Sequence, residues 1–83
     1  MVRITERKLK ISIVKIREGH NGFYNQCNKR VALLEEGQEL KILRELPDNK
    51  YICEVVNPTK ACKLHGGYHG MTVEAYVQNL EVA

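Results

Sequence analysis

Short apolar segments separated by turn-forming residues run along most of this chain, and they restrict the folds that it can adopt. These segments cover residues 9–16, 31–34, 40–43 and 50–56. Each has the length of a single β-strand, and none continues with the 3.6-residue period that indicates a helix. The sequence therefore predicts an all-β protein, and short strands joined by turns favour a small barrel.

The residues between these segments are those that reverse or interrupt a chain. Residues 35–37 read Glu-Glu-Gly and residues 46–49 read Leu-Pro-Asp-Asn, so both stretches are predicted turns. Residues 18–28 concentrate glycine and asparagine, which tolerate positive backbone angles, and they are predicted to form a loop with two aromatic side chains. After Asn57 and Pro58, a long polar segment is predicted to form a second loop.

Length and composition indicate one ordinary globular domain. The chain has 83 residues, of which 43% are hydrophobic and 28% charged. It has no apolar run long enough to cross a bilayer, and its start lacks the apolar core of a secretion signal. Three cysteines, Cys27, Cys53 and Cys62, are an odd number at irregular spacing, which favours reduced thiols. We expect a cytoplasmic protein that has no membrane partner.

The first strand has an ambiguous pattern. Leu9, Ile11 and Ile13 share one face, and lysines and a serine occupy the other. Val14 and Ile16 break this alternation, which indicates a bend, a bulge or a stretch covered on both sides. The prediction places Leu9, Ile11 and Ile13 in the core.

The closing segment, residues 70–80, reads Gly-Met-Thr-Val-Glu-Ala-Tyr-Val-Gln-Asn-Leu and resembles the end of an SH3 domain. There, a glycine leads a short strand, one helical turn follows, and a Tyr-Val pair closes the barrel before the last strand. Tyr76 and Val77 match that pair. Residues 31–43 resemble the SH3 segment in which an apolar strand meets a charged pair and a glycine. The resemblance implies a five-stranded SH3-like barrel, one domain over residues 1–83, with one short helical turn before the last strand.

The ungapped SH3 register continues from Gly37 into the strand that begins at Lys50, and it defines the expected core. A shift of one residue would turn Glu54 inward, and burying an unpaired carboxylate is costly. The predicted core consists of Leu9, Ile11, Ile13, Ala32, Leu34, Leu40, Ile42, Cys53, Val55 and Val77.

Most aromatic residues of the SH3 proline-peptide groove are missing. The opening positions near Lys15 and Ile16 carry no tyrosine, Lys50 stands at the tryptophan position, and Val73 replaces the proline. Recognition of a polyproline helix needs an aromatic-lined groove. We therefore do not expect this chain to bind proline-rich peptides in the SH3 manner.

One cluster of possible metal ligands is present. Cys62, His65 and His69 lie at short spacings, and Cys53 could complete a tetrahedral set for zinc. The paired Cys-x-x-Cys of zinc ribbons is absent, so a glycine and histidine loop that faces solvent explains the same residues. The prediction is no metal and no cofactor.

Catalytic patterns are incomplete. Cys62 and His65 would need a third orienting group and a pocket to act as a nucleophile and base. Glu35 and Glu36 lie in a predicted turn, where a solvated pair is the usual outcome. We expect no enzyme activity.

The predicted function is a monomeric, non-catalytic protein-binding module, such as a small accessory or inhibitor protein encoded by a phage or another mobile element. Loop residues are not needed to pack the core, and loops often carry binding residues. The binding face is expected on the loops at residues 20–27 and 60–68, with contacts from His20, Phe23, Tyr24, Lys60, His65 and Tyr68.

The alternative is a nucleic-acid-binding barrel of the KOW or Tudor kind. Basic side chains crowd the start of the chain and could contact phosphates, and aromatic residues on the loops could stack on bases. The candidate contacts are Lys8, Lys10, Lys15 and Arg17. The net charge of +3 is too small to require such a partner.

Overall fold

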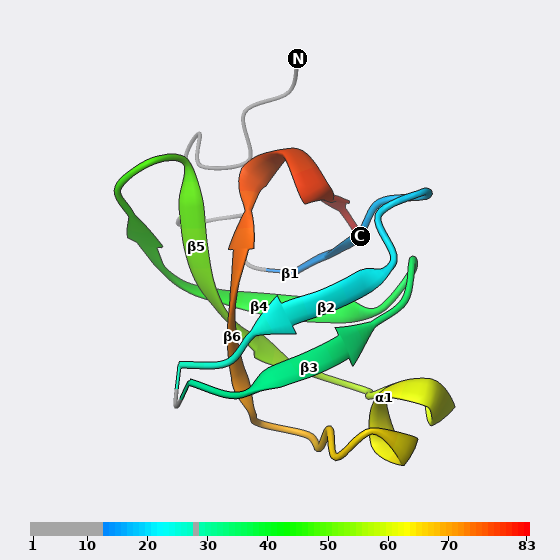
Figure 1. Ribbon diagram of the computed structural model, residues 1–83. Coiled ribbons are helices and arrows are strands. Elements are labelled where there is room, and N and C mark those ends of the chain that lie inside the picture. The colour runs from blue at the N-terminus through cyan, green and yellow to red at the C-terminus, as the bar shows by residue number, and fades with distance from the viewer. Residues whose placement is uncertain (1–12, 28) are drawn as a thin grey trace.

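The computed structural model describes residues 13–27 and 29–83, which are built mainly of β-strands (Figure 1). The strands are β1 (Ile13–Ile16), β2 (Gly22–Asn25), β3 (Val31–Leu34), β4 (Glu39–Leu46), β5 (Lys50–Val55), β6 (Thr72–Tyr76) and β7 (Leu80–Val82). A short helix, α1 (Lys60–Leu64), joins β5 to β6, and a 3-10 turn, η1 (Val77–Asn79), joins β6 to β7. The all-β class and the helical turn before the last strand are therefore confirmed.

The strands form two sheets. Five of them make an antiparallel sheet in the order β6-β5-β4-β1-β7, and β2 and β3 form a separate hairpin. The described chain thus has seven strands in a five-stranded and a two-stranded sheet, and the prediction of one five-stranded barrel is corrected in both respects. One additional strand is β2, and another arises because η1 divides the closing segment into β6 and β7.

Two elements form within predicted loops. β2 forms because Tyr24 turns inward and pairs with Ala32 of β3, which gives the glycine and asparagine segment an apolar anchor. Thr59 is the N-cap residue of α1, and its hydroxyl oxygen accepts a hydrogen bond from the Cys62 N–H at 3.1 Å. Cys62 is completely buried, so packing of this one side chain supports a helix of only five residues.

The predicted turns are confirmed. Gly37 adopts a φ of 88° in the turn between β3 and β4, a conformation that glycine tolerates best. Between β4 and β5, Pro47 is followed by Asp48 and Asn49, which both have positive φ values of 64° and 59°. Asp and Asn enter this region more readily than other side chains, so the local sequence sets the reversal.

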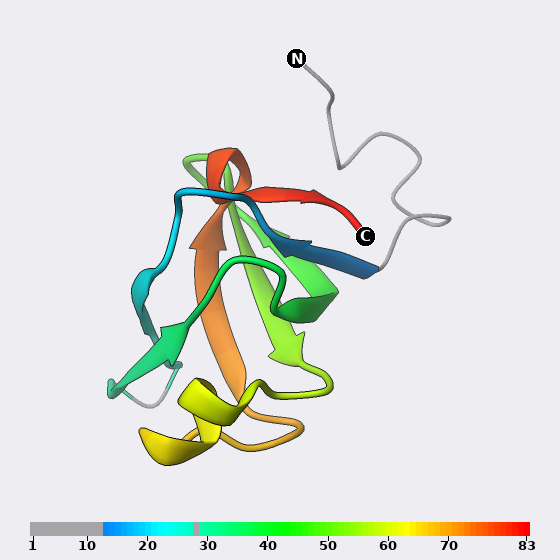
Figure 2. The same ribbon diagram turned by 90° about the vertical axis from the view of Figure 1, so that its right-hand side faces the viewer.

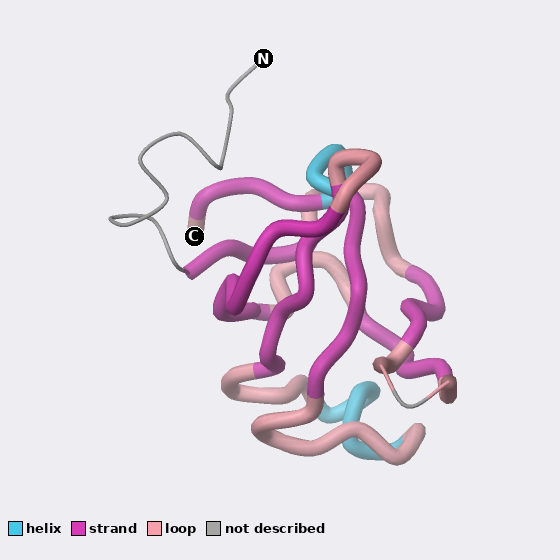
Figure 3. The backbone as a smooth tube through the Cα atoms, turned by 90° about the vertical axis from the view of Figure 1, so that its left-hand side faces the viewer, coloured by secondary structure: helices cyan, strands magenta, loops and turns pink. Residues whose placement is uncertain are grey.

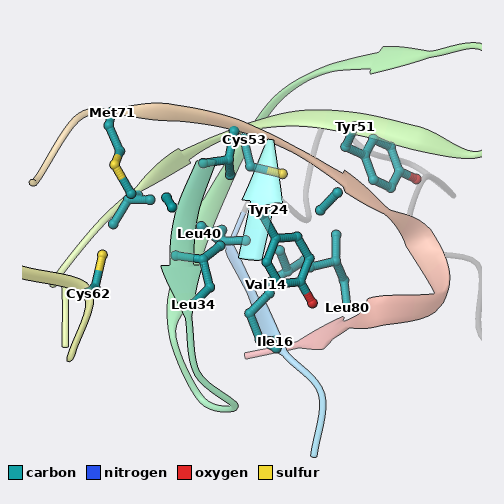
Figure 4. Close-up of a cluster of buried hydrophobic side chains, with 14 residues drawn as sticks. Val14, Ile16, Tyr24, Leu34, Leu40, Tyr51, Cys53, Cys62, Met71 and Leu80 are labelled. Carbon is teal, nitrogen blue, oxygen red and sulfur yellow. The ribbon is translucent and has the colours of Figure 1, made fainter. Parts of the chain in front are cut away.

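The hydrophobic core lies between the two sheets and extends to α1 (Figure 4). Its buried members are Val14, Ile16, Tyr24, Ala32, Leu34, Leu40, Tyr51, Cys53, Val55, Cys62, Met71, Val73, Ala75 and Leu80. The predictions for Ala32, Leu34, Leu40, Cys53 and Val55 are confirmed. Ile42 and Val77 are partly buried and pack against the cluster. The register of β5 is also as predicted, because Glu54 points away from the core.

The first strand presents the opposite face from the predicted one. Val14 and Ile16 are fully buried, whereas Ile13 is 39% exposed. Leu9 and Ile11 lie outside the described residues. β1 pairs with both β4 and β7, and this pairing directs its even-numbered side chains inward. Both faces of β1 carry isoleucine or valine, so local alternation does not distinguish them.

One buried polar side chain holds the connection to α1. Gln38 is fully buried, and its Nε2 donates to the C=O groups of Glu39 (3.0 Å) and Val56 (2.9 Å). Its Oε1 accepts from the Thr59 N–H at 2.9 Å. Buried amides are tolerated when both ends are satisfied, so these bonds fix the segment that leads into the helix.

Candidate binding surface

The β2–β3 hairpin separates two neighbouring aromatic residues. Phe23 points outward and is 64% exposed, although it lies within a strand. Tyr24 points inward, and its hydroxyl donates to the His20 C=O at 2.6 Å. Burial raises the pKa of the Tyr24 phenol, so this hydroxyl keeps the proton that it donates. Tyr24 therefore belongs to the core, which corrects its assignment to the binding face.

The two segments predicted to form the binding face do meet. The rings of Phe23 and His65 lie edge to face, with centroids 6.3 Å apart and planes at 85°. His65 follows α1 directly, and α1 packs beside β3 (Figure 2). The contact joins residues 42 positions apart in the sequence, and it brings the hairpin and the helix into one surface.

The other residues predicted for this surface are placed differently. Lys60 starts α1 and is exposed, and Tyr68 is exposed on the connection from α1 to β6. His20 lies before β2 and is half-buried, where its backbone accepts the Tyr24 hydroxyl. Leu64, at the end of α1, is the most exposed large apolar side chain among the described residues. It stands next to His65, and the sequence reasoning did not single it out.

A groove lies between β2 and β6, and we call it the β2–β6 groove. Its volume is about 410 Å³. One wall is residues 19–25, and the other is formed by Glu74, Ala75 and Tyr76 with Asn79 of η1. Figure 3 shows η1 and α1 at opposite ends of the molecule. The groove reaches η1 at Asn79, and its wall also includes Phe23, which meets His65 after α1.

Glu74 and Tyr76 share the outer face of β6 with a lysine from β5. Lys50 Nζ lies 3.5 Å from Glu74 Oε1 and 5.5 Å from the centre of the Tyr76 ring. Tyr76 is 44% exposed. The alternation of residues 72–76 places Val73 and Ala75 inward and leaves Glu74 and Tyr76 outside, and this is the signal that could have identified the wall of the groove.

The two candidate phosphate contacts within the described residues, Lys15 and Arg17, both have partners. Lys15 Nζ lies 4.0 Å from Glu81 Oε2, and Arg17 Nη1 donates to the Gln78 C=O at 3.3 Å. A shallow pocket of about 300 Å³ beside Lys15 is also lined by Glu18, Glu36 and Glu81. Lys8 and Lys10 lie outside the described residues.

Cys53 and Cys62 are buried packing residues, whereas Cys27 is exposed. Burial, and to a lesser extent the charge of Cys27, raises the pKa of Cys53 from 9.0 to about 12. Burial also raises the pKa of Cys62. Thiols that hold their protons are weak nucleophiles. Within residues 13–27 and 29–83, no three His, Cys, Asp or Glu side chains are grouped so that they could hold a metal ion.

The comparisons with known proteins give no relative. No family model matches the chain, and neither a curated protein nor a solved structure matches it. None of the helices in the described part of the chain has the length and apolar character needed to cross a membrane.

Proposed function

We propose that this chain is a non-catalytic protein-binding module with an SH3-like arrangement of its strands. Gly70 precedes β6, a single 3-10 turn follows, and β7 closes the chain, which is the order of elements implied by the closing motif. The charged pair Glu35 and Glu36, with Gly37, forms the turn from β3 to β4, as in the SH3 pattern. These features support the resemblance at the two segments that carry it.

The observation that carries the functional proposal is the exposure of Phe23. A phenylalanine within a strand normally packs inward, yet this one keeps 64% of its surface in solvent, where its ring meets the His65 ring at nearly a right angle. Leu64, which precedes His65 in the sequence, is a further exposed apolar side chain at the end of α1. Exposed aromatic groups held by a rigid element are typical anchors of protein interfaces.

We also propose that this module works in the cytoplasm. Buried thiols at Cys53 and Cys62, with no disulfide to Cys27, fit a reducing compartment such as the cytoplasm. A small monomeric accessory or inhibitor protein, such as one encoded by a phage, would use this surface to block or recruit a larger protein.

The experiment has two stages. The full chain is first used to capture a partner from extract of the cells that encode it, after nuclease treatment. The dissociation constant is then measured for wild type, Phe23→Ala and Lys41→Ala. Lys41 is the control, because it is also exposed on a strand but lies outside the lining of the β2–β6 groove.

We expect Phe23→Ala to weaken binding by about 2 kcal/mol or more, which is about thirtyfold, and Lys41→Ala to have little effect. Binding should change little between low and physiological salt. Equal effects of the two substitutions would contradict the proposal. Micromolar binding to RNA or DNA, lost when Lys8, Lys10 and Lys15 are all replaced by Gln, would support the nucleic-acid alternative instead.

A further inference from the structure

The hydrogen-bonding pattern between β5 and β6 determines which backbone groups of β6 face the β2–β6 groove. At one end of this pair, the Val55 N–H donates to the Met71 C=O at 2.9 Å, and at the other the Val77 N–H donates to the Asn49 C=O at 2.8 Å. Hydrogen-bonded pairs alternate along an antiparallel ladder. The odd-numbered residues of β6 therefore turn their backbone groups to β5, and the even-numbered residues turn theirs away.

Within residues 13–27 and 29–83, the outward-facing edge of β6 is paired only near its start. The Thr72 C=O accepts a hydrogen bond from the Cys27 N–H at 3.3 Å, and Gln26 and Val73 form an isolated antiparallel β-bridge. Beyond this bridge β2 and β6 separate (Figure 1), and the groove opens between them. The Glu74 C=O and the Tyr76 N–H are directed into this opening. Exposed strand edges of this kind are templates for a further strand.

We infer that the β2–β6 groove binds an extended segment of a partner protein as an added strand along β6. The inference rests on the proposed function, because it specifies how a protein partner is held. Main-chain hydrogen bonds to Glu74 and Tyr76 supply part of the affinity, and alternate side chains of the segment supply specificity.

The lining of the groove defines the chemistry of this segment. Glu74 is the only Asp, Glu, Lys or Arg among the lining residues, so its charge complement is a lysine or arginine. Lys50 already lies 3.5 Å from one Glu74 oxygen, but a carboxylate accepts several hydrogen bonds. The position beside Tyr76 suits an aromatic or β-branched side chain. Between the lysine or arginine opposite Glu74 and the side chain opposite Tyr76, the bound segment has one residue that points inward over the buried Ala75, and this residue is apolar.

A second copy of this chain does not fit the groove as well. β2 stands beside β6 and forms the facing wall, so the open edge is recessed. In a second copy the same edge is recessed by its own β2, and two such edges cannot approach each other. An extended peptide without flanking structure can enter.

One substitution removes the proposed hydrogen bond with little disturbance of the fold. Tyr76 has φ −74° and ψ 146°, which are angles that proline adopts. Its N–H faces away from β5, so Tyr76→Pro leaves the β5–β6 ladder intact. Tyr76→Ala is the matched control, because it removes the same side chain and keeps the N–H. Thermal unfolding of both variants checks that the fold is retained.

The probes are two capped hexapeptides, Thr-Thr-Tyr-Val-Lys-Thr and its reverse, which present the required side chains in both strand directions. At least one should bind the full chain with a dissociation constant below about 1 mM. We expect Tyr76→Pro to bind it at least tenfold more weakly than Tyr76→Ala does. In wild type, saturation with the peptide should slow hydrogen exchange of the Tyr76 amide by at least tenfold.

A charge exchange tests the second contact. Glu74→Lys should lose the lysine peptide and bind the same peptide with glutamate in place of lysine. Failure of both peptides to bind, equal affinities of Tyr76→Pro and Tyr76→Ala, or an unchanged exchange rate would each overturn strand addition. If a captured protein partner still depends on Phe23 in those cases, the proposed function stands and only the inference about β6 fails.

Discussion

Replacement of Gly67 by alanine tests whether α1 is packed as the structure shows. The Gly67 N–H donates to the Cys62 C=O at 2.7 Å, which closes the chain onto the end of the helix. A Cβ atom at position 67 would overlap Cys62 Sγ and lie 2.7 Å from the Cys62 carbonyl oxygen. Cys62 is fully buried, so its sulfur has no open space into which it can move.

The expected cost follows from these contacts. Overpacking of a well-filled site typically costs 1–3 kcal/mol. The overlap at Gly67 involves a backbone oxygen as well as the sulfur, so a rotation of one side chain cannot relieve it. We expect the free energy of unfolding to fall by about 2 kcal/mol, which for a domain of this size lowers the melting temperature by about 8–16 °C.

Urea denaturation monitored by circular dichroism measures this change, and Gly22→Ala is the control. A Cβ atom at Gly22 would meet no atom within 4 Å. Gly22→Ala should therefore stay within about 0.5 kcal/mol of wild type or stabilise slightly through the unfolded chain. In a Cys62→Ala background, the cost of Gly67→Ala should shrink but persist, because the carbonyl contact remains. Equal stability of the Gly67 and Gly22 variants would refute the described packing of α1.

Two further predictions concern the core. Val77 packs against the core and Gln78 is exposed, so Val77→Ala should lower the free energy of unfolding by about 1–2 kcal/mol in urea denaturation, whereas equal effects of Gln78→Ala would contradict this arrangement. Cys53 has a folded pKa of about 12 against an ordinary value of 9.0, so the unfolded chain loses this proton first as the pH rises. The Cys53 thiol therefore makes its full contribution to the free energy of unfolding below pH 9, and this contribution should decline by about 1.4 kcal/mol per pH unit between pH 9 and 12. Urea denaturation across this pH range should show the decline in wild type, and a slope smaller by about 1.4 kcal/mol per pH unit in Cys53→Ala.

The local signals predicted those parts of the fold that short-range chemistry determines. Gly37, Asp48 and Asn49 adopt positive backbone angles that few other residues accept, so their turns follow from residue type. Residues 31–34 and 50–55 form strands because apolar side chains alternate with side chains that stay at the surface. The face of β1 was not predictable in this way, because its pairing with β4 and β7 decides between two apolar faces.

The binding surface was predictable only in part. A binding face on the segments 20–27 and 60–68 was expected, and Phe23 and His65 from these segments do meet, but Tyr24 is drawn inward once β2 pairs with β3. No pattern within residues 18–28 distinguishes the exposed aromatic ring from the buried one without that pairing. The β2–β6 groove forms where β2 of one sheet separates from β6 of the other. This separation depends on contacts between residues far apart in the sequence, so a local sequence pattern does not predict it.

The turn between β3 and β4 connects both halves of the binding surface. On one side, the Gly19 N–H donates to Glu36 Oε1 at 3.0 Å, and the Glu36 N–H donates to Asn21 Oδ1, so the segment before β2 is tied to the turn.

On the other side, the buried Gln38 holds the Val56 C=O and the Thr59 N–H, which orients the start of α1. The segments that carry Phe23 and His65 are thus anchored to Glu36 and Gln38, which flank Gly37. A surface held in this way loses little conformational entropy on binding, since its loops are already ordered. Glu36 and Gln38 therefore serve the binding surface indirectly, by fixing the segments that carry its aromatic side chains.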